Sequence, residues 1–222
     1  MIDFEFHLYP VILKEIPFDI VSSLLYVDRV GAPENTQFGW DTPKKTALLR
    51  AVIDGSFQEK HSIWITEVNW PLEGTGRYSP ASGKPNVSES LQRDYLVRYY
   101  ILVLAGGLIE RVYWWQLAAP GYGLIDDREE NWRNRPAFSA LRFLVSQIRH
   151  SVCLGRIQND KAEIFSFRRN DEDFVVCWTN KTPCEHEFPQ RIRKITGVTG
   201  EVMSSSSKAV RIDGSPKYIY FE

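Results

Sequence analysis

The residues best suited to chemistry lie in one short segment, Ile63 to Pro71, whose sequence is IWITEVNWP. The segment is typical of an apolar strand that ends by presenting the carboxylate of Glu67, the amide of Asn69 and the indole of Trp70. A carboxylate can attack the anomeric carbon of a sugar, an amide can bond its hydroxyls, and a flat ring matches the C–H face of a pyranose. These residue types predict glycoside cleavage with Glu67 as the nucleophile. The alternatives are a Glu that is ion-paired at a strand end and an Asn that caps a loop.

A second aromatic segment, VYWWQL from Val112 to Leu117, is predicted to be another strand. Because side chains alternate along a strand, Trp114 and Trp115 must point to opposite sides. We expect one of them to bind the sugar and the other to pack under helices. Gln116 shares a face with Trp114, which favours Trp114 as the residue turned toward the site. The chain has seven Trp and ten Tyr, and large cores explain that content equally well.

The segment SSLLYVD, from Ser22 to Asp28, is a further strand candidate. Its apolar Leu25 and Val27 should face a helix layer, which leaves Tyr26 and Asp28 on the other side. From there Tyr26 could donate a hydrogen bond to the nucleophile and hold it ionised. Asp28 is followed by an arginine and is better explained by a structural ion pair.

Polar and apolar residues also alternate from Ile2 to His7, the period of a strand. If the apolar residues face helices, Asp3, Glu5 and His7 line the opposite face. Glu5 is then the local candidate for a second catalytic carboxylate, and a site lining without a catalytic role is the alternative. The rim of the site is expected to include three loop residues, Glu34, Tyr122 and Asp126.

The composition excludes several classes of protein. The net charge of −1 over 222 residues implies no polyanionic partner, so binding to nucleic acid is not expected. The three cysteines have no metal-ligand spacing, and we predict neither a metal site nor a cofactor. No signal peptide or transmembrane run is visible, which argues against a membrane partner and favours the cytoplasm, although Met1 need not be the native start.

Helix signals alternate with the strand candidates. Asp41 and Pro43 mark the start of one helix, Ser88 caps a second, and Pro136 begins a third. On the second helix the pairs Glu89/Arg93 and Asp94/Arg98 have the spacing of surface ion pairs. Alternation of strands and helices predicts a parallel sheet with crossover helices.

From about residue 151 the pattern changes to short strands separated by turns. The expected strands are Glu163–Arg168, Asp173–Thr179, Arg191–Thr196, Ala209–Asp213 and Lys217–Phe221. The sequence therefore predicts a division into residues 1–150, an α/β unit, and residues 151–222, a small antiparallel β module.

Three of these segments resemble the catalytic domain of the clan A glycoside hydrolases, which is a (β/α)8 barrel of the TIM type. ITEVNWP is similar to the clan's seventh strand, which ends in the nucleophile, and VYWWQL is similar to the eighth, which commonly brings a Trp to the sugar. LYVDRVGAPEN, residues 25–35, resembles the sixth strand and its loop in a family 39 (β-xylosidase-like) branch, and residues 151–222 resemble the β-sandwich that often follows the barrel. The resemblance implies retaining hydrolysis of O-glycosidic bonds.

The same resemblance makes the segment Ile2–His7 the fifth strand, so that only strands 5–8 have counterparts here. The clan's general acid is the Glu of an Asn-Glu pair at the end of strand four, and no such pair occurs in a strand-like context in this sequence. A retaining site needs a second carboxyl ~5–5.5 Å from the nucleophile. We therefore expect weak or no activity from the chain alone, because loss of a general acid typically costs about 10²–10⁴-fold.

A half barrel would expose two strand edges and an apolar face, both of which invite another chain. The expected partner is carbohydrate, together with a second copy or a complementary chain that completes the barrel. The chain could instead be an excerpt of a longer protein or an open α/β sheet shielded by its own β module. The alternative function is a non-catalytic carbohydrate-binding remnant that keeps the aromatic platform.

Overall fold

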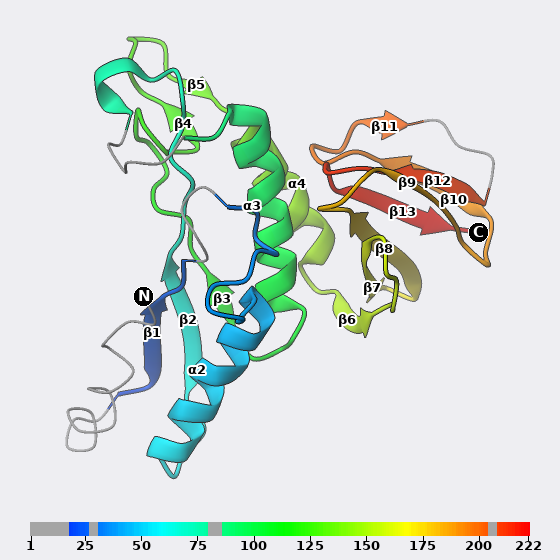
Figure 1. Ribbon diagram of the computed structural model, residues 1–222, viewed down its shortest axis with the longest axis horizontal. Helices are drawn as coiled ribbons and strands as arrows, with labels where there is room; N and C mark the ends of the chain where they lie inside the picture. The colour runs from blue at the N-terminus through cyan, green and yellow to red at the C-terminus, as the bar shows by residue number, and fades with distance from the viewer. Residues whose placement is uncertain (1–17, 27–30, 80–85, 204–207) are drawn as a thin grey trace.

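The computed structural model describes residues 18–26, 31–79, 86–203 and 208–222. Two parts are visible in Figure 1, one with a small parallel sheet and helices, the other made of antiparallel strands. The predicted strand Ile2–His7, with Glu5, and the residue Asp28 lie outside the described residues.

The first part is built on a three-stranded parallel sheet in the order β1-β2-β3. Its strands are β1 (Ile20–Leu24), β2 (Ser62–Glu67) and β3 (Arg111–Val112), and its helices are α2 (Thr42–Ser56), α3 (Glu89–Leu104) and α4 (Pro136–Ile148). A 3₁₀ turn, η2 (Gly76–Tyr78), follows β2, and a short antiparallel pair, β4 (Ile125–Asp126) and β5 (Arg133–Asn134), precedes α4. The predicted alternation of strands and helices with parallel pairing is confirmed.

The helices begin where the sequence signals them. The Asp41 side chain accepts a hydrogen bond from the Lys44 amide at 2.8 Å, and Pro43 follows in the first turn of α2. The Ser88 hydroxyl accepts from the Leu91 amide at 3.2 Å at the start of α3. Each cap satisfies a backbone donor that has no partner within its helix.

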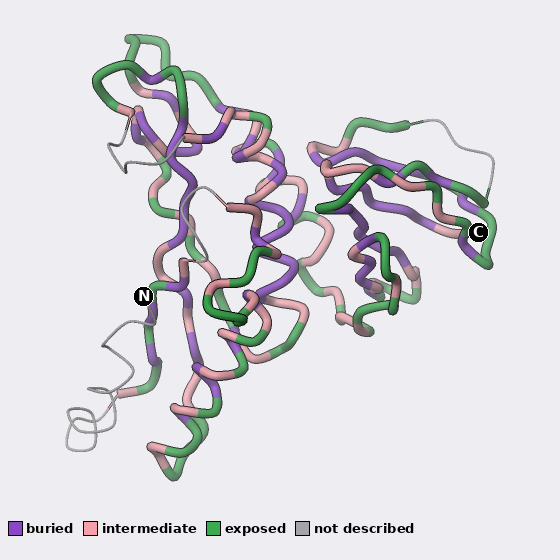
Figure 2. The backbone as a smooth tube through the Cα atoms, in the orientation of Figure 1, coloured by how far each residue is buried: buried purple, intermediate pink, exposed green. Residues whose placement is uncertain are grey.

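Only one face of the parallel sheet is covered among the described residues. Val21, Ile63 and Ile65 are almost fully buried and pack with residues of α2 and α3, whereas Ile20 and Leu24 on the opposite face of β1 are 37% and 44% exposed. Parallel sheets normally have both faces covered. The sheet does not close into a barrel within the described ranges, and Figure 2 colours the backbone of its strands by burial.

The second part consists of a six-stranded and a two-stranded antiparallel sheet. The larger has the order β11-β10-β13-β8-β7-β6 and the smaller pairs β12 with β9. The strands are β6 (Val152–Arg156), β7 (Glu163–Arg169), β8 (Glu172–Trp178), β9 (Cys184–Glu187), β10 (Ile192–Thr196), β11 (Val202–Met203), β12 (Ala209–Ile212) and β13 (Lys217–Phe221). The five predicted strands are present with end shifts of at most one residue, and β6, β9 and β11 were not predicted.

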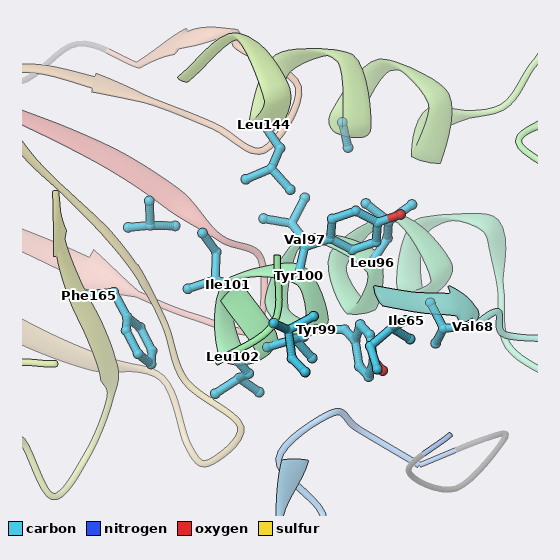
Figure 3. Packing of buried hydrophobic residues seen from close by; sticks show 14 of the residues in the cluster. Ile65, Val68, Leu96, Val97, Tyr99, Tyr100, Ile101, Leu102, Leu144 and Phe165 are labelled. Atoms are coloured by element: carbon cyan, nitrogen blue, oxygen red, sulfur yellow. The ribbon is translucent and has the colours of Figure 1, made fainter. Parts of the chain in front are cut away.

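The larger sheet is buried on both faces, which joins the two parts of the molecule. Ile164, Val175 and Ile219 pack toward the smaller sheet. Phe165 and Trp178 belong instead to the core that α3 shares with the parallel sheet. Figure 3 shows α3 lying between Ile65 of β2 and Phe165 of β7. One continuous core thus includes residues from both sides of residue 150. The division of the chain at that residue stays a prediction.

Two predictions about the helical part were wrong. The segment Val112 to Leu117 is not one strand: β3 ends at Val112, and the chain beyond it is irregular. The pairs expected on the surface of α3 do not form, because this helix is buried on nearly all sides. Arg98 is 3% exposed and pairs with Glu34, while Glu89 pairs with Arg133 and Arg135.

Candidate active site

Three residues that the sequence singled out lie together at the carboxyl end of the parallel strands. The Tyr26 hydroxyl donates to Glu67 Oε1 at 2.5 Å, and the Asn69 amide Nδ2 donates to the Tyr26 hydroxyl at 3.3 Å. Glu67 and Tyr26 are half-buried, and Asn69 is 8% exposed. Glu67 forms no ion pair with any described residue. The arrangement is an oriented carboxylate at a partly open position, rather than the ion-paired Glu that was the alternative.

An irregularity in the sheet brings Glu67 to this place. Ser23 pairs with Ile65, but the next residue, Leu24, pairs with Glu67, so β2 has one extra residue at its end. In a regular strand Glu67 would share the helix-facing side with Ile65. The bulge re-aims the side chain, a common function of bulges near active sites, and Glu67 meets Tyr26.

The helix α3 fixes the backbone around this site. The Tyr99 hydroxyl donates to the Leu25 carbonyl at 2.5 Å, one residue before Tyr26. Gln92, which is fully buried, donates from Nε2 to the Trp70 carbonyl at 2.9 Å and to the Tyr122 carbonyl at 3.2 Å. Sequence reasoning missed Gln92, because a lone Gln on a helix is typical of a solvated face.

Trp70 is not available to a sugar. It is 1% exposed, its indole N–H donates to the Gly31 carbonyl at 2.9 Å, and its ring packs against Tyr95, Tyr99 and Trp114 with centroid distances of 5.6, 5.7 and 6.1 Å. The prediction of direct contact with substrate therefore does not fit. Trp70 instead supports the site indirectly, because its indole N–H holds the backbone of the loop at Gly31.

Trp114 was expected to turn toward the site and Trp115 to pack in the core, but in the structure Trp114 is the one packed against the core and Trp115 is exposed. Trp114 is half-buried, stacks on Trp70 and donates to the Tyr122 carbonyl at 3.1 Å. Trp115 is 45% exposed, and its amide donates to the Val68 carbonyl at 3.1 Å, next to Glu67 in sequence. The strand alternation on which the preference for Trp114 rested ends at Val112, and the Trp115–Gln116 peptide is cis. Gln116 donates to the Ala118 carbonyl at 2.9 Å.

The three residues predicted at the rim of the site, Glu34, Tyr122 and Asp126, form hydrogen bonds with other residues of the protein. The Glu34 side chain is 6% exposed and accepts from Arg98. Asp126 is 7% exposed and accepts from Arg128 and Arg133. Tyr122 is half-buried, and its carbonyl receives the bonds from Gln92 and Trp114. The carboxylates of Glu34 and Asp126 are thus occupied by arginines rather than open to a ligand.

A fully buried arginine holds the loop between β3 and α4. Arg135 donates from Nη1 to the carbonyls of Ala119 and Gly123 at 2.8 Å each, and from Nη2 to the Pro120 carbonyl at 2.7 Å. Burial lowers the pKa of its guanidinium, and the nearby Asp126 opposes that effect. This residue was also missed, because an Arg before a helix has the pattern of a surface residue.

Acid should weaken this loop through Asp126. Hydrogen bonds from Arg128 hold the pKa of the Asp126 carboxyl far below its usual range, against the opposing effect of burial. Such a group stabilises the fold fully above its unfolded pKa of about 3.9, and that stability is lost as the pH falls further. We expect the midpoint of urea unfolding to drop more steeply below about pH 4 in the unmodified chain than in Asp126→Asn. Parallel curves for the two proteins would contradict this assignment.

The described residues contain no group of three or more His, Cys, Asp or Glu side chains placed to hold a metal ion. In the same part of the chain, no helix is both long and apolar enough to cross a membrane.

Solved structures of glycoside hydrolases share this fold. A family 39 glycoside hydrolase from the gut symbiont Bacteroides cellulosilyticus WH2 matches with a TM-score of 0.72 and 16% identity over 92% of this chain and 44% of its own. A GH51 arabinofuranosidase from Xanthomonas axonopodis pv. citri matches with a TM-score of 0.61 and 10% identity over 99% and 56%. A GH30 endoxylanase from Clostridium papyrosolvens C71 gives 0.54 and 11% over 92% and 49%.

The chain thus spans about half the length of the solved structures that it matches. No protein-family model matches it, and no curated protein matches it in sequence. At these identities the likeness shows a glycosidase-like fold.

Proposed function

We propose that this chain carries the nucleophile side of a retaining glycoside hydrolase site, with Glu67 as the nucleophile. The observation that carries the proposal is the Tyr26–Glu67 contact of 2.5 Å at the end of a parallel strand. A carboxylate held by one neutral donor, without a cationic partner among the described residues, keeps its second oxygen for attack on an anomeric carbon. The fold that this chain shares with three glycoside hydrolases supports that chemistry, but it does not identify the residues that perform it.

We assign the sugar platform to Trp115, whose backbone lies next to the strand end that carries Glu67. Trp115 is 45% exposed and its amide bonds the residue after Glu67, so its ring is the platform that we assign to the sugar. Asn69 reaches the same hydroxyl as Glu67 and completes the polar part. Gln116, the next residue in the chain, stays a candidate sugar contact in this proposal.

The reaction needs a second carboxyl that acts as the acid. We assign it to a polypeptide segment that covers the open face of the parallel sheet, where Ile20 and Leu24 are exposed. Either a second copy of the chain or a complementary chain could supply that segment. Light scattering of the purified protein is expected to detect an assembly larger than one chain, and a monodisperse monomer would remove the pairing proposal.

The names of the matched solved structures guide which substrates to test first. Their names refer to an arabinofuranosidase and an endoxylanase, so glycosides of pentoses are the first compounds to try. Glucosides and galactosides belong in the same panel, because no described contact separates these sugars.

Activated fluoroglycosides test the nucleophile without its partner acid. A 2,4-dinitrophenolate leaves without being protonated, and fluorine at C2 slows release of the sugar from the enzyme. If Glu67 is a nucleophile, incubation with 2,4-dinitrophenyl 2-deoxy-2-fluoroglycosides should add one sugar mass, and peptide mapping should place it on Glu67.

The alternative is a carbohydrate-binding remnant without catalysis. The exposed Trp115 favours it, because an aromatic platform binds sugar whether or not a nucleophile acts. Xylo-oligosaccharide binding by calorimetry, together with no adduct from any glycoside in the panel, would support this function and reject the first. Adduct formation at a residue other than Glu67 would also reject the first.

A further inference from the structure

The buried carboxylate of Glu34 is contacted by two separate parts of the molecule. Arg98 of α3 donates from Nε to Glu34 Oε1 at 2.9 Å, and its Nη2 donates to Oε2. The indole N–H of Trp178, in β8 of the β-sandwich, donates to the same Oε1 at 2.6 Å. Both charged side chains are nearly inaccessible, with 4% of Arg98 and 6% of Glu34 exposed. A helix and a sandwich strand therefore meet at one side chain of the loop between β1 and α2.

That loop is the one that supports the candidate site. Three residues before Glu34, the Gly31 carbonyl accepts from Trp70, which packs beneath Trp114. On the other side of Glu34, Gln37 accepts from Lys45 Nζ at 2.7 Å, and the same ammonium group donates to the Tyr26 carbonyl at 3.3 Å. The loop thus contacts the site from two directions, through Trp70 and through the backbone of Tyr26.

We propose that Glu34 is a positioning residue through which the β-sandwich holds the β1–α2 loop, and with it Tyr26, in the geometry that orients Glu67. The sandwich is then part of the support of the active site. The consequence for Glu67 rests on the proposed function, whereas the anchoring of the loop does not.

The chemistry of the contact explains why a charged residue stands there. A buried ion pair adds little net stability compared with apolar residues, but it fixes one geometry, since a displaced partner would leave a charge buried and unpaired. Bonds from a guanidinium and an indole reach Glu34 from different elements, so the loop has one low-energy position. An apolar side chain at residue 34 would fill the space without defining that position.

Hydrogen exchange followed by mass spectrometry tests the anchoring. Glu34→Gln removes the charge at nearly constant volume, and Trp178→Phe removes the indole donor while Glu34 stays paired with Arg98. Each variant should speed exchange of the amides of residues 31–40 by at least about 10-fold, because local opening requires breaking this contact. Exchange of the Leu25 and Tyr26 amides should rise with it.

Asp94→Asn is the matched control. Asp94 also joins α3 to the sandwich, since its carboxylate accepts from the Ser215 hydroxyl at 3.0 Å, and its side chain is 12% exposed. It forms no hydrogen bond with residues 31–40, and its described partners are Arg93 and Ser215. A variant that merely loosens the sandwich should behave as this control does, with a lower unfolding midpoint and unchanged exchange in the loop.

Two results would overturn the proposal. One is exchange of residues 31–40 that stays unchanged in both Glu34→Gln and Trp178→Phe, or that rises equally in Asp94→Asn. The other is faster exchange in the loop with no change at Leu25 and Tyr26, which would separate the loop from the site. If the unmodified chain forms a fluoroglycoside adduct, Glu34→Gln should slow its formation more than Asp94→Asn does. Absence of any adduct counts against the proposed function and leaves the exchange result to decide this one.

Discussion

Glu67→Gln is expected to abolish fluoroglycoside labelling while leaving the fold and saccharide binding in place. The amide oxygen of Gln can still accept the Tyr26 hydrogen bond, so the 2.5 Å contact should be replaced by a similar one. An amide is not a nucleophile toward an anomeric carbon, and removal of a nucleophile costs more than about 10³-fold. Intact mass spectrometry should detect no adduct in the variant under conditions that label the unmodified chain fully.

Glu73→Gln provides the control for this variant. Glu73 is an exposed carboxylate six residues further along, on the loop that follows β2. Labelling of Glu73→Gln should proceed at the rate of the unmodified chain. Persistent labelling of Glu67→Gln would show that another group reacts. Loss of labelling in both variants would point to a general effect of carboxylate removal on this end of the sheet.

The sequence predicted which residues come together at the candidate site better than it predicted the residues that support them. Tyr26, Glu67 and Asn69 are short-range features: each lies at or just beyond a strand, and strand alternation places Tyr26 opposite the buried Leu25. The capped helices and most strands of the β module follow from equally local signals. The parallel sheet was predictable from alternation of elements, because crossover connections determine strand direction.

The errors have long-range causes. Trp70 is an aromatic residue three positions after Glu67 in the sequence, but a carbonyl from another loop, at Gly31, holds its indole inside the core. Glu34 has the pattern of a loop residue and becomes buried because Arg98 and Trp178, both far away in the chain, lie against it. Such partners leave no periodic trace in the sequence. The preference for Trp114 over Trp115 as the residue turned toward the site depended on strand alternation, but the strand ends at Val112.

Replacement of Arg135 is expected to have the largest effect on stability. The guanidinium is 0% exposed and serves three carbonyls at 2.8 Å or less, and it also lies 3.3 Å from both Glu89 and Asp126. Arg135→Met fills similar volume but leaves these acceptors without their donor. Removing one partner from a buried network of this kind typically costs about 3–5 kcal/mol of unfolding free energy, which urea denaturation can measure.

Arg133→Met separates this effect from loss of a surface charge. Arg133 pairs with the same Glu89 and Asp126, but its side chain is 51% exposed. Its loss should cost about 1 kcal/mol or less, since solvent screens exposed ion pairs. The loop that Arg135 holds is also tightly packed at Gly123. The Gly123 backbone lies so close to Ala119 that a methyl group there would come within 2.3 Å of the Ala119 nitrogen. Equal costs for the two Arg variants would show that Arg135 does not organise the loop.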